Sequence, residues 1–178
     1  AGGWGVVAAD AVTAHRSLTL TTLPDDLLTA VDGMLPPRWS RNNPVDLAAG
    51  ETRDTIPELL DMVTGHPGVD SVVQLGLGIQ GNTAALTRSS PFHPGHGLER
   101  MVDFHERQER RYAEAAAEAS ATHEKPVLVA SELAVTQPDN PMVTAVRDTG
   151  RLCYPSADRA VAALGHLVRY AAWHRARI

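Results

Sequence analysis

The sequence predicts an α/β fold in which helices cover both faces of a mostly parallel sheet. Two apolar runs, 69–75 and 126–130, are rich in Val and Leu and are bounded by Gly or Pro, which is typical of buried parallel strands. A segment with helical apolar spacing precedes the first run, with Ile56, Leu59 and Val63 on one face, and a charged helix from about Leu98 to Thr122 is expected between the two runs. Strands that alternate with helices form βαβ crossovers, and these place the strands parallel in one sheet.

The other elements follow from local signals. Gly2-Gly3-Trp4-Gly5 leads into a helix of small residues, and 18–21 alternates Leu with Thr like a short strand. The region from Gly76 to Gly97 lacks an apolar pattern, so we expect a long loop there. Capping residues and apolar patterns predict a strand at 152–154 and further helices that begin near Pro24, Thr52, Leu98, Asn140 and Ser156.

The number of strands predicts the kind of sheet. A glycine-rich turn normally follows a strand, so we expect a first strand ahead of Gly2 that is truncated in this sequence. With that strand included, we expect a sheet of about five strands, which fits a flavodoxin-like three-layer sandwich. The 178 residues suit a single domain spanning 1–178.

Composition and charge argue against several classes of protein. The net charge is -5 and Lys125 is the only lysine, so we expect no nucleic-acid partner. A single cysteine, Cys153, allows no internal disulfide and fits a reducing compartment. No apolar stretch is long enough for a membrane span, and the start does not resemble a signal peptide. We therefore expect a cytoplasmic protein with no membrane partner.

The densest basic group lies on the helix that is expected after Leu98. Its three arginines, Arg107, Arg110 and Arg111, alternate with Glu106 and Glu109. Mixed charges of this kind are typical of the solvated face of a helix.

The glycine-rich turn is the strongest candidate for a binding site. Glycines allow close approach of the backbone, and the first N–H groups of a helix attract an anion. We therefore predict a phosphate site formed by Gly2, Gly3, Trp4, Gly5 and Val6. A tight turn without any ligand is the alternative, because short glycine patterns occur often by chance.

Other polar groups give weaker signals. By spacing alone, Asn43-Pro44-Val45-Asp46 is typical of a turn whose side chains bind their own backbone. His93 and His96 with Glu99 supply too few fixed ligands, so we expect no metal site. No ordered Ser, His and Asp set is visible, and we expect no catalytic residue in this chain.

Several segments together resemble the CoA-ligase domain of ADP-forming acetyl-CoA synthetases, that is, NDP-forming acyl-CoA synthetases. The same domain is related to the carboxy-terminal domain of the succinyl-CoA synthetase β subunit. The resemblance covers nearly the whole chain apart from 81–123, which is longer than is usual and is expected to be an insertion. Trp4 also departs from the family, which has proline or a small residue there. The segments that carry the resemblance are 1–10, 41–47, 68–75, 125–129 and 154–161.

The resemblance implies a role in phosphoryl transfer. Such enzymes pass a phosphoryl group from an acyl phosphate to an enzyme histidine and then to a nucleoside diphosphate, and helix N-termini hold the phosphohistidine. The helix that follows Gly2 would be one of these helices. The resemblance further implies that Asn43, Asp46, Gly78 and Ile79 contact a small carboxylic acid substrate.

The resemblance also implies that the chemistry needs other domains. A CoA-binding domain, the phosphohistidine segment and an ATP-grasp domain would be the partners. CoA, ATP or ADP and Mg²⁺ would bind in the parent enzyme, with no cofactor in this domain, and the chain alone would be inactive. A regulatory or ligand-sensing domain of a multidomain protein acyltransferase is the alternative. A flavin-binding protein is a weaker one, because no aromatic pair is evident that could sandwich the ring.

Overall fold

The computed structural model describes residues 2–49, 52 and 54–177. Within these residues the sheet has three strands, β1 (Val72–Gln74), β2 (Val127–Ala130) and β3 (Cys153–Tyr154), which are parallel in the order β1-β2-β3. The eight helices of the described residues are α1 (Gly2–Ala14), α2 (Asp25–Asp32), α3 (Thr55–Gly65), α4 (Ile79–Arg88), α5 (Leu98–His123), α6 (Leu133–Thr136), α7 (Pro141–Asp148) and α8 (Ala157–Arg175).

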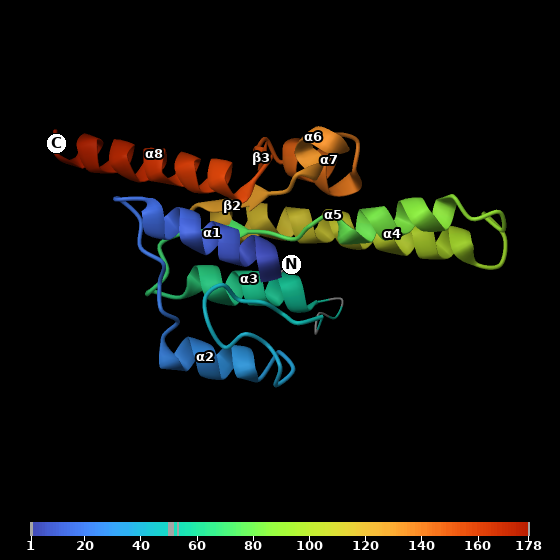
Figure 1. Ribbon diagram of the computed structural model, residues 1–178, viewed down its shortest axis with the longest axis horizontal. Coiled ribbons are helices and arrows are strands. Elements are labelled where there is room, and N and C mark those ends of the chain that lie inside the picture. The colour runs from blue at the N-terminus through green and yellow to red at the C-terminus, as the bar shows by residue number, and fades with distance from the viewer. Residues whose placement is uncertain (1, 50–51, 53, 178) are drawn as a thin grey trace.

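The central strand β2 shows how the three layers form. Val127 and Val129 pack against α5 and α7 on one face, whereas Leu128 and Ala130 pack against α8 on the other. This alternation follows from the two-residue period of a strand. Helix α1 lies beside α8 on the second face (Figure 1). The α/β sandwich predicted from the sequence is therefore confirmed, and it is consistent with a flavodoxin-like fold.

The sheet is smaller than predicted, with three strands rather than about five. The segment 18–21 is extended but belongs to no strand. A strand needs a neighbouring ladder to bond its backbone groups, and none of the described strands pairs with this segment. Its prediction as a strand was wrong because alternation of side chains does not supply a pairing partner.

The prediction of a long loop from Gly76 to Gly97 was also wrong, because a helix occupies much of this region. Helix α4 occupies Ile79–Arg88 and packs along α5. Figure 1 shows the two helices side by side as a hairpin that extends away from the sheet. This region was difficult to recognise as a helix because half of α4 consists of Gly, Asn, Thr and Gln residues.

Two helix starts were predicted correctly by their capping residues. Asn140 accepts a hydrogen bond from Met142 N, and Ser156 accepts one from Arg159 N. Each satisfies a backbone donor that a helix cannot satisfy by itself. None of the helices in the described part of the chain has the length and apolar character that crossing a membrane requires.

Candidate functional site

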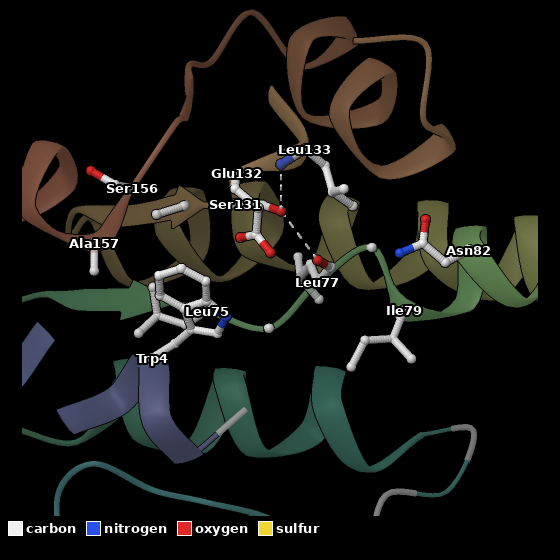
Figure 2. Close-up of a pocket in the computed structure, with 13 residues that line it drawn as sticks. Trp4, Leu75, Leu77, Ile79, Asn82, Ser131, Glu132, Leu133, Ser156 and Ala157 are labelled. Carbon is white, nitrogen blue, oxygen red and sulfur yellow. Dashed lines mark hydrogen bonds between the residues drawn. The ribbon is translucent and has the colours of Figure 1, made fainter. Parts of the chain in front are cut away.

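A small cleft lies where the parallel strands end at their carboxyl side. Its walls are the turn after β1, the turn between β2 and α6, the start of α8, and Trp4 from α1 (Figure 2). Its volume is about 140 Å³. Ligands of open α/β sheets bind at this edge, because the connecting turns and helix starts meet there. We call it the strand-end cleft, and its lining residues include Trp4, Gly78, Ile79, Ser131, Glu132 and Ser156.

The turn between β1 and α4 requires glycine. Gly76 and Gly78 have φ angles of 77° and 105°, which are unfavourable for other residues. A Cβ at Gly78 would also collide with the Cδ1 of Leu133. This second constraint fixes how closely the turn approaches α6 across the cleft.

A buried carboxylate occupies the start of α4. Glu109 of α5 is 1% exposed, and its two oxygens accept hydrogen bonds from Gly78 N at 2.7 Å and Gly81 N at 3.0 Å. Burial raises the pKa of this carboxyl group, and the N–H donors oppose that rise. An internal anion thus binds the positive end of α4, where an external phosphate would otherwise be favoured.

Ser131 joins three elements at the back of the cleft. Its backbone N–H donates to Tyr154 O at 2.8 Å, and its hydroxyl donates to Leu77 O at 3.4 Å. The same hydroxyl accepts a bond from Leu133 N at 3.3 Å. Figure 2 draws both hydroxyl contacts. Ser131 therefore holds the turns after β1 and β2 in a fixed relation.

The start of α8 is the better candidate for binding an anion. Ser156 and Ala157 line the cleft, and α8 is 19 residues long. Its first N–H groups and its dipole favour a negative charge at this end. No Lys, Arg or His is among the described residues that line the cleft. An anion there would be held by backbone donors, and it would have to tolerate the nearby carboxylate of Glu132.

The residues predicted to bind phosphate do not all face this cleft. Trp4 lines it, whereas Gly2 and Gly5 line a second, larger cavity. A Cβ at Gly2 would lie 2.5 Å from Asp46 Oδ2, and one at Gly5 would lie 2.8 Å from Pro44 Cβ. A Cβ at Gly3 would meet nothing within 4 Å, and Val6 is exposed. Phosphate binding by these five residues stays a prediction.

The four residues predicted to contact substrate divide in a similar way. Gly78 and Ile79 line the strand-end cleft, where they lie near Trp4. Asn43 and Asp46 line the second cavity. The side chain of Asn43 donates to Thr21 O at 2.9 Å, and Asp46 Oδ1 accepts a bond from Ala48 N at 3.1 Å. The bond of Asp46 is local and agrees with the turn suggested by spacing, whereas the bond of Asn43 reaches a residue 22 positions away. The substrate role of these residues stays a prediction.

Glu109 was expected on a solvated helix face, and this expectation was wrong because the side chain is buried. A signal was available in the spacing, because Glu109 lies seven residues after Val102 and four before Ala113, and both are buried. These positions share one face of a helix. The charge pattern of the neighbouring arginines obscured it.

Comparisons with known proteins agree with this architecture. The family model of the Ligase-CoA domain matches residues 1–80. The crystal structure of PH0766 from Pyrococcus horikoshii OT3 is similar with a TM-score of 0.62 and 22% identity, covering 94% of this chain and 33% of that one. The chain thus spans about a third of the length of that structure. No curated protein sequence matched. The match to the Ligase-CoA domain supports the CoA-ligase domain predicted from the sequence, and the structural similarity supports the fold.

Proposed function

We propose that this chain, whose residues 1–80 match the Ligase-CoA domain, is part of an NDP-forming acyl-CoA synthetase and helps to hold a phosphorylated histidine. One observation carries the proposal: the first turns of α1 and α8 line the same cleft, through Trp4 on one side and through Ser156 and Ala157 on the other. The start of α8 would offer backbone donors and a helix dipole to a phosphoryl group there, and the first turn of α1 would close the other side of the cleft through Trp4.

The size of the strand-end cleft suits this role. Pockets for drug-sized ligands have volumes of roughly 300–1,000 Å³. A cleft of about 140 Å³ fits a phosphoryl group on a side chain better than a nucleotide or CoA. The parent enzyme would bind CoA, ATP or ADP and Mg²⁺ on its CoA-binding and ATP-grasp domains. The small carboxylic acid would be joined to CoA as ATP is converted to ADP and phosphate.

The phosphoryl group would be stabilised here without covalent chemistry from this chain. It carries about −1.5 to −2 charges at neutral pH, so each backbone donor forms a charge-assisted hydrogen bond. The histidine would come from another domain of the same enzyme, and the chain alone would be inactive. We infer a cytoplasmic enzyme, because CoA and ATP are used there.

Two residues that line the strand-end cleft, Trp4 and Glu132, favour a second function. The Trp4 side chain lies beside the turn after β1 (Figure 2), and Glu132 adds a carboxylate at the lining. Both features reduce the room and the electrostatic attraction for a phosphoryl group. A regulatory or ligand-sensing domain of a protein acyltransferase would need no phosphoryl group in this cleft.

The test replaces Ser156, the N-cap residue of α8, with residues that also cap a helix but differ in charge. Asp and Asn both cap helices well, but only Asp adds a negative charge. In the intact protein, S156D should lower phosphohistidine formation from radiolabelled ATP by about tenfold or more, whereas S156N should retain it. CoA affinity should be equal in both variants.

The result also separates the two candidate functions. Equal phosphohistidine yields in S156D and S156N would remove the phosphate-holding role from α8. If the unmodified protein forms no phosphohistidine, but an acid or acyl-CoA raises its thermal midpoint, the sensor function is supported and the ligase function is excluded.

A further inference from the structure

The helix α8 extends well beyond the sheet that it covers. It begins at the strand-end cleft and its 19 residues span about 28 Å, whereas the four residues of β2 span about 13 Å. A Cβ at Gly165 would collide with the ring of His15, which follows α1. From 166 to 177 none of the described residues is buried, and Figure 1 shows this part of α8 projecting past α1. We call residues 166–177 the α8 extension.

Aromatic and arginine side chains lie on one side of the α8 extension. Tyr170, Trp173 and Arg177 are three and four positions apart, so they share a face of the helix, and Arg169 lies next to them. Tyr170 is 64% exposed and Trp173 is 49% exposed. Their rings stack with centroids 5.8 Å apart, and the Cζ of Arg177 lies 4.0 Å from the centroid of the Trp173 ring. Tyr, Trp and Arg are the residue types that contribute most to protein–protein interfaces. We call these four residues the aromatic–arginine face.

The charge of this part of the chain is opposite to that of the rest. Positions 159–178 contain four arginines and no Lys, Asp or Glu, which gives a net charge of +4. The other positions hold the remaining 12 of the 16 Lys and Arg residues and all 21 Asp and Glu residues, a net charge of -9. Two surfaces of opposite charge on one protein favour contact between its copies, whereas like-charged surfaces repel.

Exposed acidic side chains gather at the amino end of the sheet, which α8 passes. Asp26 Oδ2 at the start of α2 lies 3.2 Å from His66 Nε2, and Lys125 Nζ, just before β2, donates to His66 O at 2.7 Å. These contacts place the start of α2, the end of α3 and the start of β2 together. The exposed acidic residues of these segments, which we call the acidic edge, are Asp25, Asp26, Asp61, Asp70 and Glu124.

The aromatic–arginine face does not lie on the acidic edge of its own chain. Figure 1 shows α8 and α2 on opposite sides of the molecule. A second copy related by a twofold axis matches both surfaces at once, because each copy offers the surface that the other requires. A helix end of this length is only marginally stable in water, so packing against a partner would also stabilise it.

We propose that the α8 extension is an interface between two copies of this protein, in which the aromatic–arginine face of each copy packs against the acidic edge of the other. Tyr170 and Trp173 supply the apolar contact, and Arg169 and Arg177 pair with carboxylates of the acidic edge. The interface goes beyond the function assigned to the strand-end cleft and does not depend on it, because the α8 extension lies past the opposite end of the sheet.

Charge reversal in the intact protein tests the interface from both sides. Sedimentation velocity at low salt should show a dimer, and R169E/R177E should raise its dissociation constant about tenfold or more. D25R/D70R should raise it similarly, and a protein with all four changes should recover the dimer because the two charges are exchanged.

Two variants with the same changes in charge serve as matched controls. R107E/R159E and D103R/D139R alter exposed residues away from the α8 extension and the acidic edge, so the dissociation constant should stay unchanged. Circular dichroism checks that every variant is folded. Equal dissociation constants in the charge-reversed variants and their controls would overturn the proposal.

A photo-crosslink identifies what covers the aromatic–arginine face. Trp173→p-benzoylphenylalanine in a mixture of unlabelled and isotope-labelled protein should give products that join position 173 to a peptide of the acidic edge, with the two peptides from different copies. Products joined only within one copy would overturn the proposal. A protein that stays monomeric, and binds anionic lipid vesicles or an acidic peptide through Arg169 and Arg177, would also overturn it and assign this face to a different partner.

Discussion

Two glycine-rich helix starts look alike in this sequence and differ in the folded chain. Gly2-Gly3-Trp4-Gly5 forms the first turn of α1, whereas Gly76-Leu77-Gly78 precedes α4. At α4 the donors of Gly78 and Gly81 bind the buried carboxylate of Glu109. At α1 no residue forces a left-handed backbone, and Gly3 faces open space. A glycine pattern therefore shows where the backbone approaches something closely, but not whether that neighbour is a ligand or part of the protein.

The largest effect should come from Gly78. Changing it to alanine forces an L residue to φ 105° and drives the Cβ into Leu133. Backbone strain and overpacking together should lower the free energy of unfolding by about 4 kcal/mol. Urea denaturation followed by circular dichroism measures the change.

A matched control separates the two causes at Gly78. Gly150 has a φ of 76°, and a Cβ there would meet nothing within 4 Å. G150A should therefore cost only the backbone strain, about 1–2 kcal/mol. Equal losses in G78A and G150A would show that α6 is not tightly packed against the turn.

The second effect concerns the carboxylate that binds the start of α4. The E109Q side chain has the same shape but only one acceptor oxygen, so one of the two glycine N–H groups loses its partner. We expect a loss of about 2 kcal/mol in the free energy of unfolding. E114Q, on the exposed face of the same helix, should change it by less than about 0.5 kcal/mol. A stable E109Q protein would mean that the α4 start does not depend on this carboxylate.

The pH dependence of stability tests the role of the buried Glu109 carboxyl group independently. Burial raises the pKa of its carboxyl group in the folded state, so the folded chain binds this proton more tightly than the unfolded chain. Its contribution to stability is therefore present below the ordinary pKa of glutamate, about 4.3, and declines as pH rises through the folded value. Unfolding measured from pH 4 upward should show this decline in the unmodified chain and lack it in E109Q. Parallel curves for the two proteins would contradict the assignment.

The sequence predicted best those elements that depend on local pattern. The strand β2 was recognisable because Val127, Leu128 and Val129 are buried on both faces, and the cap of α8 because Ser156 precedes it directly. The segment 18–21 has a strand pattern, yet pairing depends on a neighbour that its own residues do not specify. Glu109 and Gly78 are 31 positions apart, so their bond arises from tertiary packing alone.

The smallest effects should appear within α1 itself, where two glycines of the same turn have different surroundings. A Cβ at Gly5 would lie 2.8 Å from the ring of Pro44, whereas one at Gly3 would meet nothing within 4 Å. G5A should therefore lower the free energy of unfolding by about 1–2 kcal/mol through overpacking, although alanine favours the helix. G3A gains the helical preference without a clash, so it should raise the free energy of unfolding by up to about 1 kcal/mol. Thermal unfolding of both variants beside the unmodified chain measures the difference. If G3A is destabilised as much as G5A, the backbone at Gly3 is not helical in solution, and the first turn of α1 would then resemble the turn before α4 after all.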